Sequence, residues 1–319
     1  MPTSRPADAR APILVTMGEP GGVGPEVAVA AFDALDGIAG THPLRLVGLP
    51  DVFRAHALLP DDAIIASSGA VHCRSGVADA SNAPAVIAAI DHAVAEALGG
   101  RAAAIVTAPI HKASLMQAGF AFPGHTEYLQ HLTGASRAVM MLAGGGLRVV
   151  PLTIHLPLAD VPGAITRDAI IATAEIVLAA LGREFQIANP RLAIAGLNPH
   201  AGEGSRLGHA ETEVIGPAAD ELRARGFDVV GPLSADTMFH AEARARYDAA
   251  LCMYHDQALI PIKTLAFWEG VNVTLGLPIV RTSPDHGTAL DIAGQGIADP
   301  RSMIAAIELA AAMADARAV

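Results

Sequence analysis

The chain has 319 residues, of which 52% are hydrophobic and 17% charged, and its formal net charge is −11. This length suits two lobes better than one simple domain, and the hydrophobic content excludes a disordered or fibrous chain. The acidic balance, with no lysine or arginine cluster, argues against a nucleic-acid partner, and the most apolar stretch, 303–314, is too short to span a membrane.

Apolar runs alternate with amphipathic or alanine-rich stretches along the chain. We predict strands at 12–17, 44–49, 103–107, 138–142, 147–153, 191–195 and 249–253, and helices at 25–35, 83–98, 167–181, 211–225 and 302–316. Strands that alternate with helices are typical of an α/β fold with a largely parallel sheet. No repeat or linker marks a domain boundary.

A glycine-rich turn, Gly18–Gly24, separates the first predicted strand from the first predicted helix. That is the position of the phosphate loop in dinucleotide-binding folds. Its spacing is not Gly-x-Gly-x-x-Gly, however, and the next strand is followed by Pro50 rather than by an acidic residue that could hold a ribose. We interpret the segment as a tight turn that shapes the first strand–helix connection.

Three histidines, His155, His200 and His255, each follow an apolar strand candidate. Three neutral imidazoles bind Zn²⁺ or a similar ion and leave positions open for a substrate. Their long separations exclude a local zinc-finger-like site, although a fold can assemble distant ligands. In a chain with 13 histidines, each one taken singly is as well explained by a hydrogen-bonded or surface role, so the residues alone do not join the three.

A second set of residues is cationic or polar. Lys263 lies in a mostly apolar stretch, and Arg281 ends an apolar run. Phosphate is a suitable partner for such charges, because arginine binds it through two parallel hydrogen bonds and lysine as a point charge. Each cation alone is equally consistent with a side chain that reaches solvent or pairs with an acid. Asn272, His125 and Thr126 complete this set.

The most specific run is Asp-His-Gly-Thr-Ala-Leu-Asp-Ile-Ala-Gly at 285–294, which continues through Asp299-Pro300. It resembles the adenosine-binding loop of the isocitrate and isopropylmalate dehydrogenase superfamily. Over nearly its whole length the chain resembles a narrower family, the 4-hydroxythreonine-4-phosphate dehydrogenases of vitamin B6 biosynthesis. The matching segments are 17–26, 107–112, 123–127, 197–203, 254–257 and 270–278.

The resemblance implies two α/β/α lobes with a largely parallel sheet and an interlobe cleft. We expect a cofactor-side lobe at 1–125 and 282–319, and a lobe for metal, substrate and dimerisation at 126–281. The implied ligands of one divalent ion (Zn, Mg or Co), at the subunit interface of a homodimer, are His155, His200 and His255. The implied substrate-binding residues are His125, Thr126, Lys263, Asn272 and Arg281. The implied NAD-binding residues are His286, Gly287, Thr288, Ala289, Asp291 and Asp299.

The implied reaction is the NAD- and metal-dependent oxidation of 4-(phosphooxy)-L-threonine, with decarboxylation to 3-amino-2-oxopropyl phosphate, for pyridoxal 5'-phosphate biosynthesis. Asp236 is our candidate proton acceptor, beside Asp256 and Lys112. Each is also consistent with a structural cap or with a group that orients an imidazole. The carboxylate of Asp291 favours NAD over NADP, since it can accept hydrogen bonds from ribose hydroxyls and would repel a 2′-phosphate.

Two alternatives stay open. One is 4-phospho-D-threonate or 4-phospho-D-erythronate 3-dehydrogenase, whose substrates also carry a phosphate. Family members that oxidise an aromatic cis-dihydrodiol without phosphate are expected to lack Asn272 and Arg281, which this chain keeps. The alternative from another class is a non-catalytic nucleotide- or metabolite-binding protein on the same fold, which need not keep three histidines.

The cysteine count bears on the cellular compartment. Cys73 and Cys252 can form neither a metal cluster nor a disulfide framework. Residues 1–10 are polar and lack the apolar run of a signal peptide. We therefore expect a cytoplasmic protein.

Overall fold

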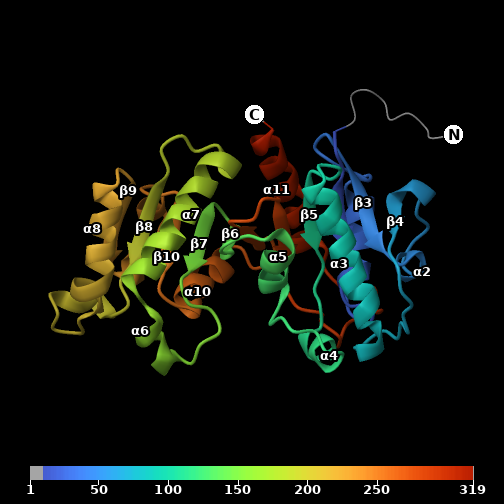
Figure 1. Cartoon of the computed structure of the whole chain (residues 1–319), viewed down its shortest axis with the longest axis horizontal. Coiled ribbons are helices and arrows are strands. Elements are labelled where there is room, and N and C mark those ends of the chain that lie inside the picture. The colour runs from blue at the N-terminus through green and yellow to red at the C-terminus, as the bar shows by residue number, and fades with distance from the viewer. Residues whose placement is uncertain (1–9, 319) are drawn as a thin grey trace. The chain divides into compact units, whose positions relative to one another are not determined.

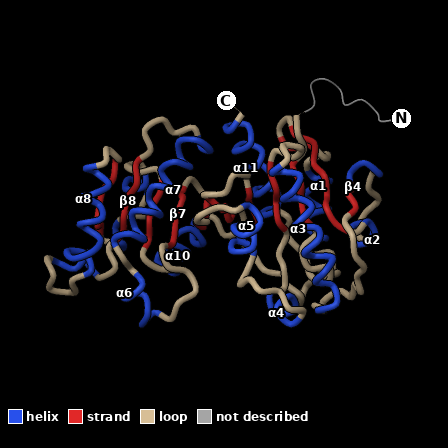
Figure 2. The backbone as a smooth tube through the Cα atoms, in the orientation of Figure 1, coloured by secondary structure: helices blue, strands red, loops and turns tan. Residues whose placement is uncertain are grey.

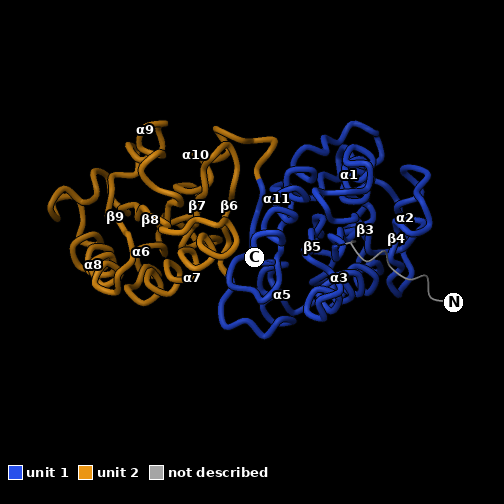
Figure 3. Tube along the Cα trace, turned by 90° about the horizontal axis from the view of Figure 1, so that it is seen from above, with its two compact units in different colours: residues 1–138, 271–319 blue, residues 139–270 orange. Residues whose placement is uncertain are grey.

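The computed structural model describes residues 10–318 of the chain (Figure 1). These residues form two compact units: unit 1 holds the chain up to Ala138 and from Val271 onward, and unit 2 holds Val139–Gly270 (Figure 3). Helices and strands alternate in both units (Figure 2). Within the described part, no helix is long and apolar enough to cross a membrane.

Unit 1 contains seven of the strands and six α-helices of the described chain. Its strands are β1 (Ile13–Thr16), β2 (Ile38–Ala39), β3 (His42–Gly48), β4 (Ile64–Ala66), β5 (Ala104–Thr107), β11 (Val271–Leu275) and β12 (Arg281–Pro284). Its α-helices are α1 (Gly24–Ala34), α2 (Pro50–Arg54), α3 (Ala83–Leu98), α4 (Lys112–Gln117), α5 (His125–Thr133) and α11 (Arg301–Arg317), and its 3-10 turns are η1 (Asp61–Ala63) and η2 (Ala80–Asn82).

The strands of unit 1 run in the order β2-β3-β1-β5-β12-β11, with β4 beside β3. β1 is parallel to β3 and β5, and β12 is parallel to β5, whereas β11 is antiparallel to β12. Helix α3 packs on one face of this sheet, and α1 and α11 lie together on the other (Figure 3). All residues of β1 and β5 are buried, as expected for parallel strands covered by helices on both faces.

Unit 2 is a second α/β unit. Its strands are β6 (Val139–Gly144), β7 (Leu147–Pro151), β8 (Arg191–Ala195), β9 (Asp228–Leu233) and β10 (Ala249–Cys252). Its α-helices are α6 (Val161–Ala164), α7 (Arg167–Phe185), α8 (Gly216–Ala224), α9 (Ala241–Arg244) and α10 (His255–Leu265). Its shorter turns are η3 (Leu158–Asp160), η4 (Pro199–Glu203), η5 (Glu211–Ile215) and η6 (Ala235–Thr237).

The strands of unit 2 follow the order β6-β7-β10-β8-β9. β10 is parallel to both β7 and β8, and β8 is parallel to β9, while β6 and β7 form an antiparallel hairpin. Helices α7 and α8 lie on one face of the sheet and α10 on the other (Figure 3). The fold class expected from the sequence, mixed α/β with a largely parallel sheet, is confirmed.

Most predicted elements are present with small shifts at their ends. The helix predicted at 83–98 and the strand predicted at 191–195 have the predicted bounds. The helix predicted at 211–225 begins as a π-helical turn, Glu211–Ile215, before it becomes α8. His255, which the sequence places after a predicted strand, is the first residue of a helix, α10, that was not predicted.

Candidate active site

Three neighbouring strands of unit 2 bring the candidate metal ligands to one edge of the sheet. His155 follows β7, His200 lies in η4 after β8, and His255 begins α10, the helix that follows β10. Because β10 is parallel to both other strands, their carboxyl ends meet at this edge. We call these three residues the histidine site.

The rings of His155 and His255 lie near each other, with centroids 6.0 Å apart and planes inclined by 40°. Two imidazoles on one tetrahedral ion, with metal–nitrogen bonds of ~2.1 Å, would place their ring centres roughly 5 Å apart. This pair is therefore close to ligand spacing. Among residues 10–318, however, no three His, Cys, Asp or Glu side chains are gathered closely enough to hold an ion within one chain.

Carboxylates accompany two of the histidines. Asp256 Oδ1 lies 2.7 Å from His255 Nδ1, and when that nitrogen donates, the ring keeps its Nε2 lone pair for a metal. The pKa of Asp236 lies below its usual value, chiefly because the Ser234 hydroxyl donates to it, and His200 nearby lowers it further. Both acids thus neighbour the histidine site.

Buried hydrogen bonds tie together the strand ends that carry the three histidines. The Thr153 hydroxyl donates to the Met253 carbonyl at 2.8 Å, which joins β7 to β10. The Gln257 side chain accepts from Met253 N and donates to the Gly196 carbonyl, both at 2.7 Å, which joins β10 to β8. Neither Thr153 nor Gln257 carries a signal in the sequence that points to this role.

A buried arginine is the centre of a second site, in unit 1. Arg281 is 3% exposed. Its Nε and Nη2 donate to the Thr107 hydroxyl at 3.1 and 2.6 Å, and its Nη1 donates to the Thr274 hydroxyl at 2.7 Å. It forms no ion pair with any described residue, and burial lowers its pKa to about 10. A buried cation held only by neutral groups is costly unless an anion joins it.

Other groups with unused hydrogen-bonding capacity belong to the same unit. His125, the first residue of α5, has a buried Nε2 without a partner, and Asn272 has a buried Oδ1 without one. Burial, together with the charges of Arg281 and Lys112, holds the pKa of His125 well below its usual value. His125 is thus a neutral ring close to two cations. We call Arg281, His125 and Lys112 the anion site.

The start of α5 adds to this positive environment. Its N-cap is Gly124, and no side chain caps the first turn, which contains Thr126. A Cβ on Gly124 would lie 3.4 Å from Lys112 Cε, so Lys112 passes close to the helix end. Free amide groups at a helix start favour an anion. Thr126 therefore lies in a helix turn whose free amide groups are suited to an anion.

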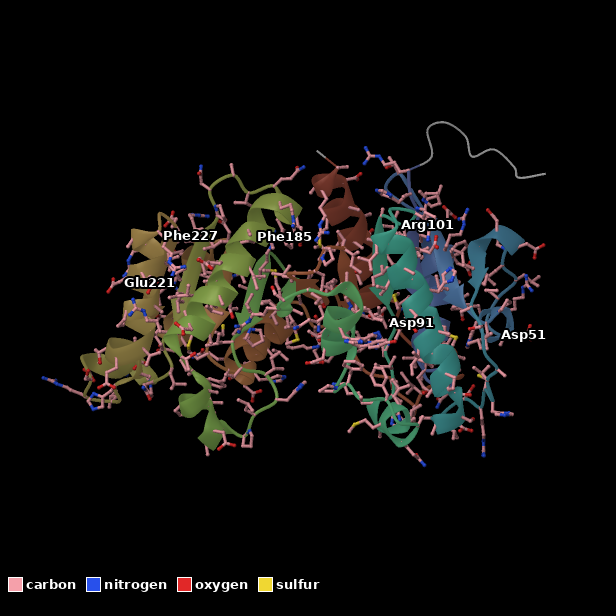
Figure 4. All side chains as sticks on the ribbon, in the orientation of Figure 1. Asp51, Asp91, Arg101, Phe185, Glu221 and Phe227 are labelled. Carbon is pink, nitrogen blue, oxygen red and sulfur yellow. The ribbon has the colours of Figure 1, made fainter. Side chains whose placement is uncertain are left out.

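Helix α5 is anchored to its own unit by aromatic side chains. The Tyr128 hydroxyl donates to Asp91 on α3, the helix on which Figure 4 labels Asp91. The Tyr128 ring also packs against Phe120 and Phe122, with ring centroids 4.9 and 5.0 Å apart. These contacts fix the position of the helix end that carries His125.

The expected cofactor loop joins β12 to α11 and packs against the glycine-rich turn. Val23 N donates to the Thr288 carbonyl at 2.9 Å, and a Cβ on Gly22 would lie 2.8 Å from the same oxygen. Glu26 accepts from Gly294 N at 3.1 Å and from Ala298 N at 3.3 Å. Close backbone packing therefore accounts for glycine at position 22, and Glu26 holds the far end of the loop.

The residues expected to bind NAD all lie along this one loop. Ala289 has a left-handed backbone with φ 41°, and His286 Nδ1 lies 2.9 Å from the Gly287 carbonyl. Asp291 is exposed, whereas Asp299 pairs with Arg301 at the start of α11. One substrate candidate lies elsewhere: Lys263 is on α10 in unit 2, with its Nζ 5.4 Å from the centre of the Phe267 ring.

The fold, two α/β units with polar residues at the ends of parallel strands, is shared with a β-decarboxylating dehydrogenase of known structure. The structure of such an enzyme from Thermococcus kodakarensis matches with a TM-score of 0.51 and 17% identity, over 97% of this chain and 84% of that one. At this identity the match concerns the fold alone.

Closer relatives define the family. The family model described as pyridoxal phosphate biosynthetic protein PdxA matches residues 43–310. The 4-hydroxythreonine-4-phosphate dehydrogenase of Roseobacter denitrificans is 54% identical over 322 residues, which cover 96% of this chain and 98% of that protein. The crystal structure of the Klebsiella pneumoniae enzyme of that name matches with a TM-score of 0.84 and 37% identity, over 95% and 99% of the two chains. The chain belongs to the PdxA family, which confirms the resemblance seen in the sequence.

Proposed function

We propose that this protein oxidises 4-(phosphooxy)-L-threonine with NAD and a divalent metal ion, and that the product loses CO₂ to give 3-amino-2-oxopropyl phosphate in vitamin B6 biosynthesis. The observation that carries the proposal is the buried Arg281, which has no acidic partner in the described part of the chain. Family membership and the names of the relatives support the reaction type.

The anion site would bind the phosphate of the substrate. Arg281 supplies a charge held in place by Thr107 and Thr274, and Lys112 supplies a second, more exposed one. His125 Nε2 and the first amides of α5 supply neutral donors. A dianionic group satisfies all of these at once, whereas a hydroxyl satisfies only one or two. Lys263 and Asn272 remain proposed substrate contacts.

The histidine site would hold the metal ion. The proximity of His155 and His255 fits two imidazole ligands, and we propose His200 as the third. A single described chain gathers two of the three, which fits a site completed across a homodimer interface. When bound, a divalent ion would act as a Lewis acid toward the hydroxyl to be oxidised.

NAD would lie on the loop from His286 to Asp299 and accept the hydride. Two hydrogen bonds hold this segment in unit 1: Glu26 accepts from its backbone, and Val23 N donates to its backbone. The proton of the substrate hydroxyl needs an acceptor, and Asp236 is our candidate. We also propose that the enzyme is cytoplasmic.

The test is NADH formation with purified protein. We expect turnover with 4-(phosphooxy)-L-threonine, its loss with a chelator, and its return when Zn²⁺, Mg²⁺ or Co²⁺ is restored. Faster turnover of 4-phospho-D-threonate or 4-phospho-D-erythronate would favour the alternative substrate. No NADH with any of these substrates, in protein that still binds NAD, would favour a non-catalytic binding protein.

A further inference from the structure

The loop that carries His200 has an unusual backbone. Seven non-glycine residues of the described chain have positive φ, and four of them lie between 200 and 205. They are His200 at 53°, Ala201 at 49°, Glu203 at 42° and Ser205 at 72°. Side chains disfavour this conformation because Cβ crowds the following carbonyl oxygen. A run of such residues persists only where the surroundings hold it.

A buried carboxylate supplies this restraint. Glu211, at the start of the π-helical turn η5, is 3% exposed. Its Oε1 accepts from Asn198 N at 2.7 Å, and its Oε2 accepts from Asn198 Nδ2 at 3.0 Å. Asn198 is two residues before His200, so the carboxylate is hydrogen-bonded to the start of the loop.

The loop also folds around this carboxylate. A Cβ on Gly202 would lie 2.6 Å from Glu211 Oε2, and a Cβ on Gly196 would lie 3.2 Å from Oε1. A Cβ on Gly208 would lie 2.4 Å from Asn198 Nδ2. Burial raises the pKa of Glu211, but the hydrogen bonds from Asn198 more than offset it, and the pKa lies below its ordinary value. The ionised carboxylate is thus matched to its site.

We propose that Glu211, acting through Asn198, is a positioning residue that holds His200 in the conformation that binds the metal ion. The inference rests on the proposed function, because that proposal assigns His200 as a ligand. Glu211 accepts two hydrogen bonds from the loop and contacts its backbone. Its removal would let the left-handed run relax and carry the imidazole away from its position.

The first experiment compares two buried glutamates by the same substitution. Glu211→Gln places a donor where the loop offers a donor, whereas Glu184→Gln alters a 2% exposed carboxylate on α7 that pairs with Arg183. Co²⁺ affinity is measured by titration of its visible absorption, and the melting temperature is measured without metal. We expect Glu211→Gln to bind Co²⁺ about 10–100-fold more weakly, and Glu184→Gln to bind it as the wild type does.

A swap of donor and acceptor separates positioning from general stability. Asn198→Asp alone sets two carboxylates against each other and is expected to weaken Co²⁺ binding. The double variant Asn198→Asp with Glu211→Gln restores an acceptor opposite a donor, and we expect most of the affinity to return. A double variant that binds no better than Asn198→Asp overturns the inference. Asn198→Ala, which deletes only the side-chain donor, gives the same test if Glu211→Gln does not fold.

His200→Ala distinguishes this inference from the proposed function. If His200→Ala loses Co²⁺ while Glu211→Gln binds it with wild-type affinity, the inference about Glu211 is wrong and the metal site stands. If wild type and His200→Ala bind Co²⁺ equally, or neither binds it, the metal site itself is wrong and both proposals fall.

Discussion

The anion site of unit 1 is built around a buried charge, whereas two of the three histidines of the histidine site in unit 2 lie on exposed loops. Arg281 is buried and fixed by two threonine hydroxyls from neighbouring strands. His155 and His200 are exposed. Hydrogen bonds of the buried side chains of Thr153 and Glu211 hold their loops in place.

The contrast shows two ways to prepare a site. A buried charge is oriented during folding and costs stability until its partner arrives. Exposed ligands cost little stability, because water solvates them, but their geometry depends on the buried side chains that hold their loops. Substitutions in the two sites should therefore divide their effects between stability and binding in opposite ways.

The largest effect is expected at the histidine site. His200→Ala should lose the metal ion and lower kcat by roughly 10³-fold or more, since metal-ion catalysis is worth several kcal/mol and each ~1.4 kcal/mol is tenfold. Because His200 is exposed, the melting temperature of the metal-free protein should hardly change. Metal analysis, turnover and thermal unfolding check this, and normal metal content with near-normal turnover would contradict it.

Arg281→Met should have the opposite profile. Loss of one charge-assisted partner costs about 1.5–3 kcal/mol of binding, which raises KM for the phosphorylated substrate by roughly 10–150-fold. The unliganded protein should be at least as stable as the wild type, because an unpaired buried cation is replaced by an apolar side chain of similar length. Kinetics with phosphorylated and unphosphorylated substrate, with denaturant unfolding, measure both. Equal weakening for the two substrates would remove Arg281 from the phosphate site.

Gln257→Leu tests the buried hydrogen bonds that support the histidine site. It leaves Met253 N and the Gly196 carbonyl without their partner, and an unsatisfied buried group costs about 1–3 kcal/mol. We expect lower stability together with weaker metal binding. Gln257→Glu keeps the acceptor for Met253 N and should retain more of both. Wild-type metal affinity in a clearly destabilised Gln257→Leu would show that the strand ends are not coupled to the ligands.

Thr107→Val is the matching change in the anion site. It removes the acceptor for Arg281 Nε and Nη2 and keeps the shape of the side chain. The guanidinium would be less well oriented, and we expect KM for the phosphorylated substrate to rise by up to about tenfold, from ~1 kcal/mol of hydrogen bonding. Thr282→Val, which removes a buried hydroxyl bonded to the Ala306 carbonyl on α11, is the control and should leave KM unchanged.

The smallest effect is a pH dependence from His125. Its pKa is lowered in the folded protein by burial and by Arg281 and Lys112, so the unfolded chain binds the proton first as the pH falls. Stability is therefore lost as the pH drops below the usual histidine value near ~6.5, by at most ~1.4 kcal/mol per pH unit. Denaturant unfolding at several pH values should show a shallower loss in His125→Gln. An identical slope would mean that His125 is not held neutral.

The sequence predicts the strands and helices that are rich in apolar residues, such as α3 and β8, because a regular spacing of apolar residues is a local signal. It misses α10, where Pro261 lies inside the helix, and α5, whose first turn is polar. It also misses β12, where Arg-Thr-Ser-Pro is fully buried. These elements owe their structure to tertiary contacts that no short window contains.

The same distinction applies to the sites. Arg281 was predicted as a phosphate ligand from its place after an apolar run and from family resemblance. Its partner Thr107 lies 174 residues away, and a threonine at the end of a strand carries no special signal. Glu211 likewise begins a predicted helix, and nothing in the sequence links it to Asn198. Long-range hydrogen bonds between ordinary residue types become visible only in the folded chain.

The buried Arg281 also has a consequence for how the protein behaves in solution. Any small oxyanion that enters the anion site binds only the folded chain and therefore stabilises it by mass action, by RT ln(1 + [L]/Kd). Inorganic phosphate or sulfate should raise the melting temperature and compete with the substrate, while chloride at equal ionic strength should do neither. The choice of buffer would then alter both the apparent stability and the apparent KM of this enzyme.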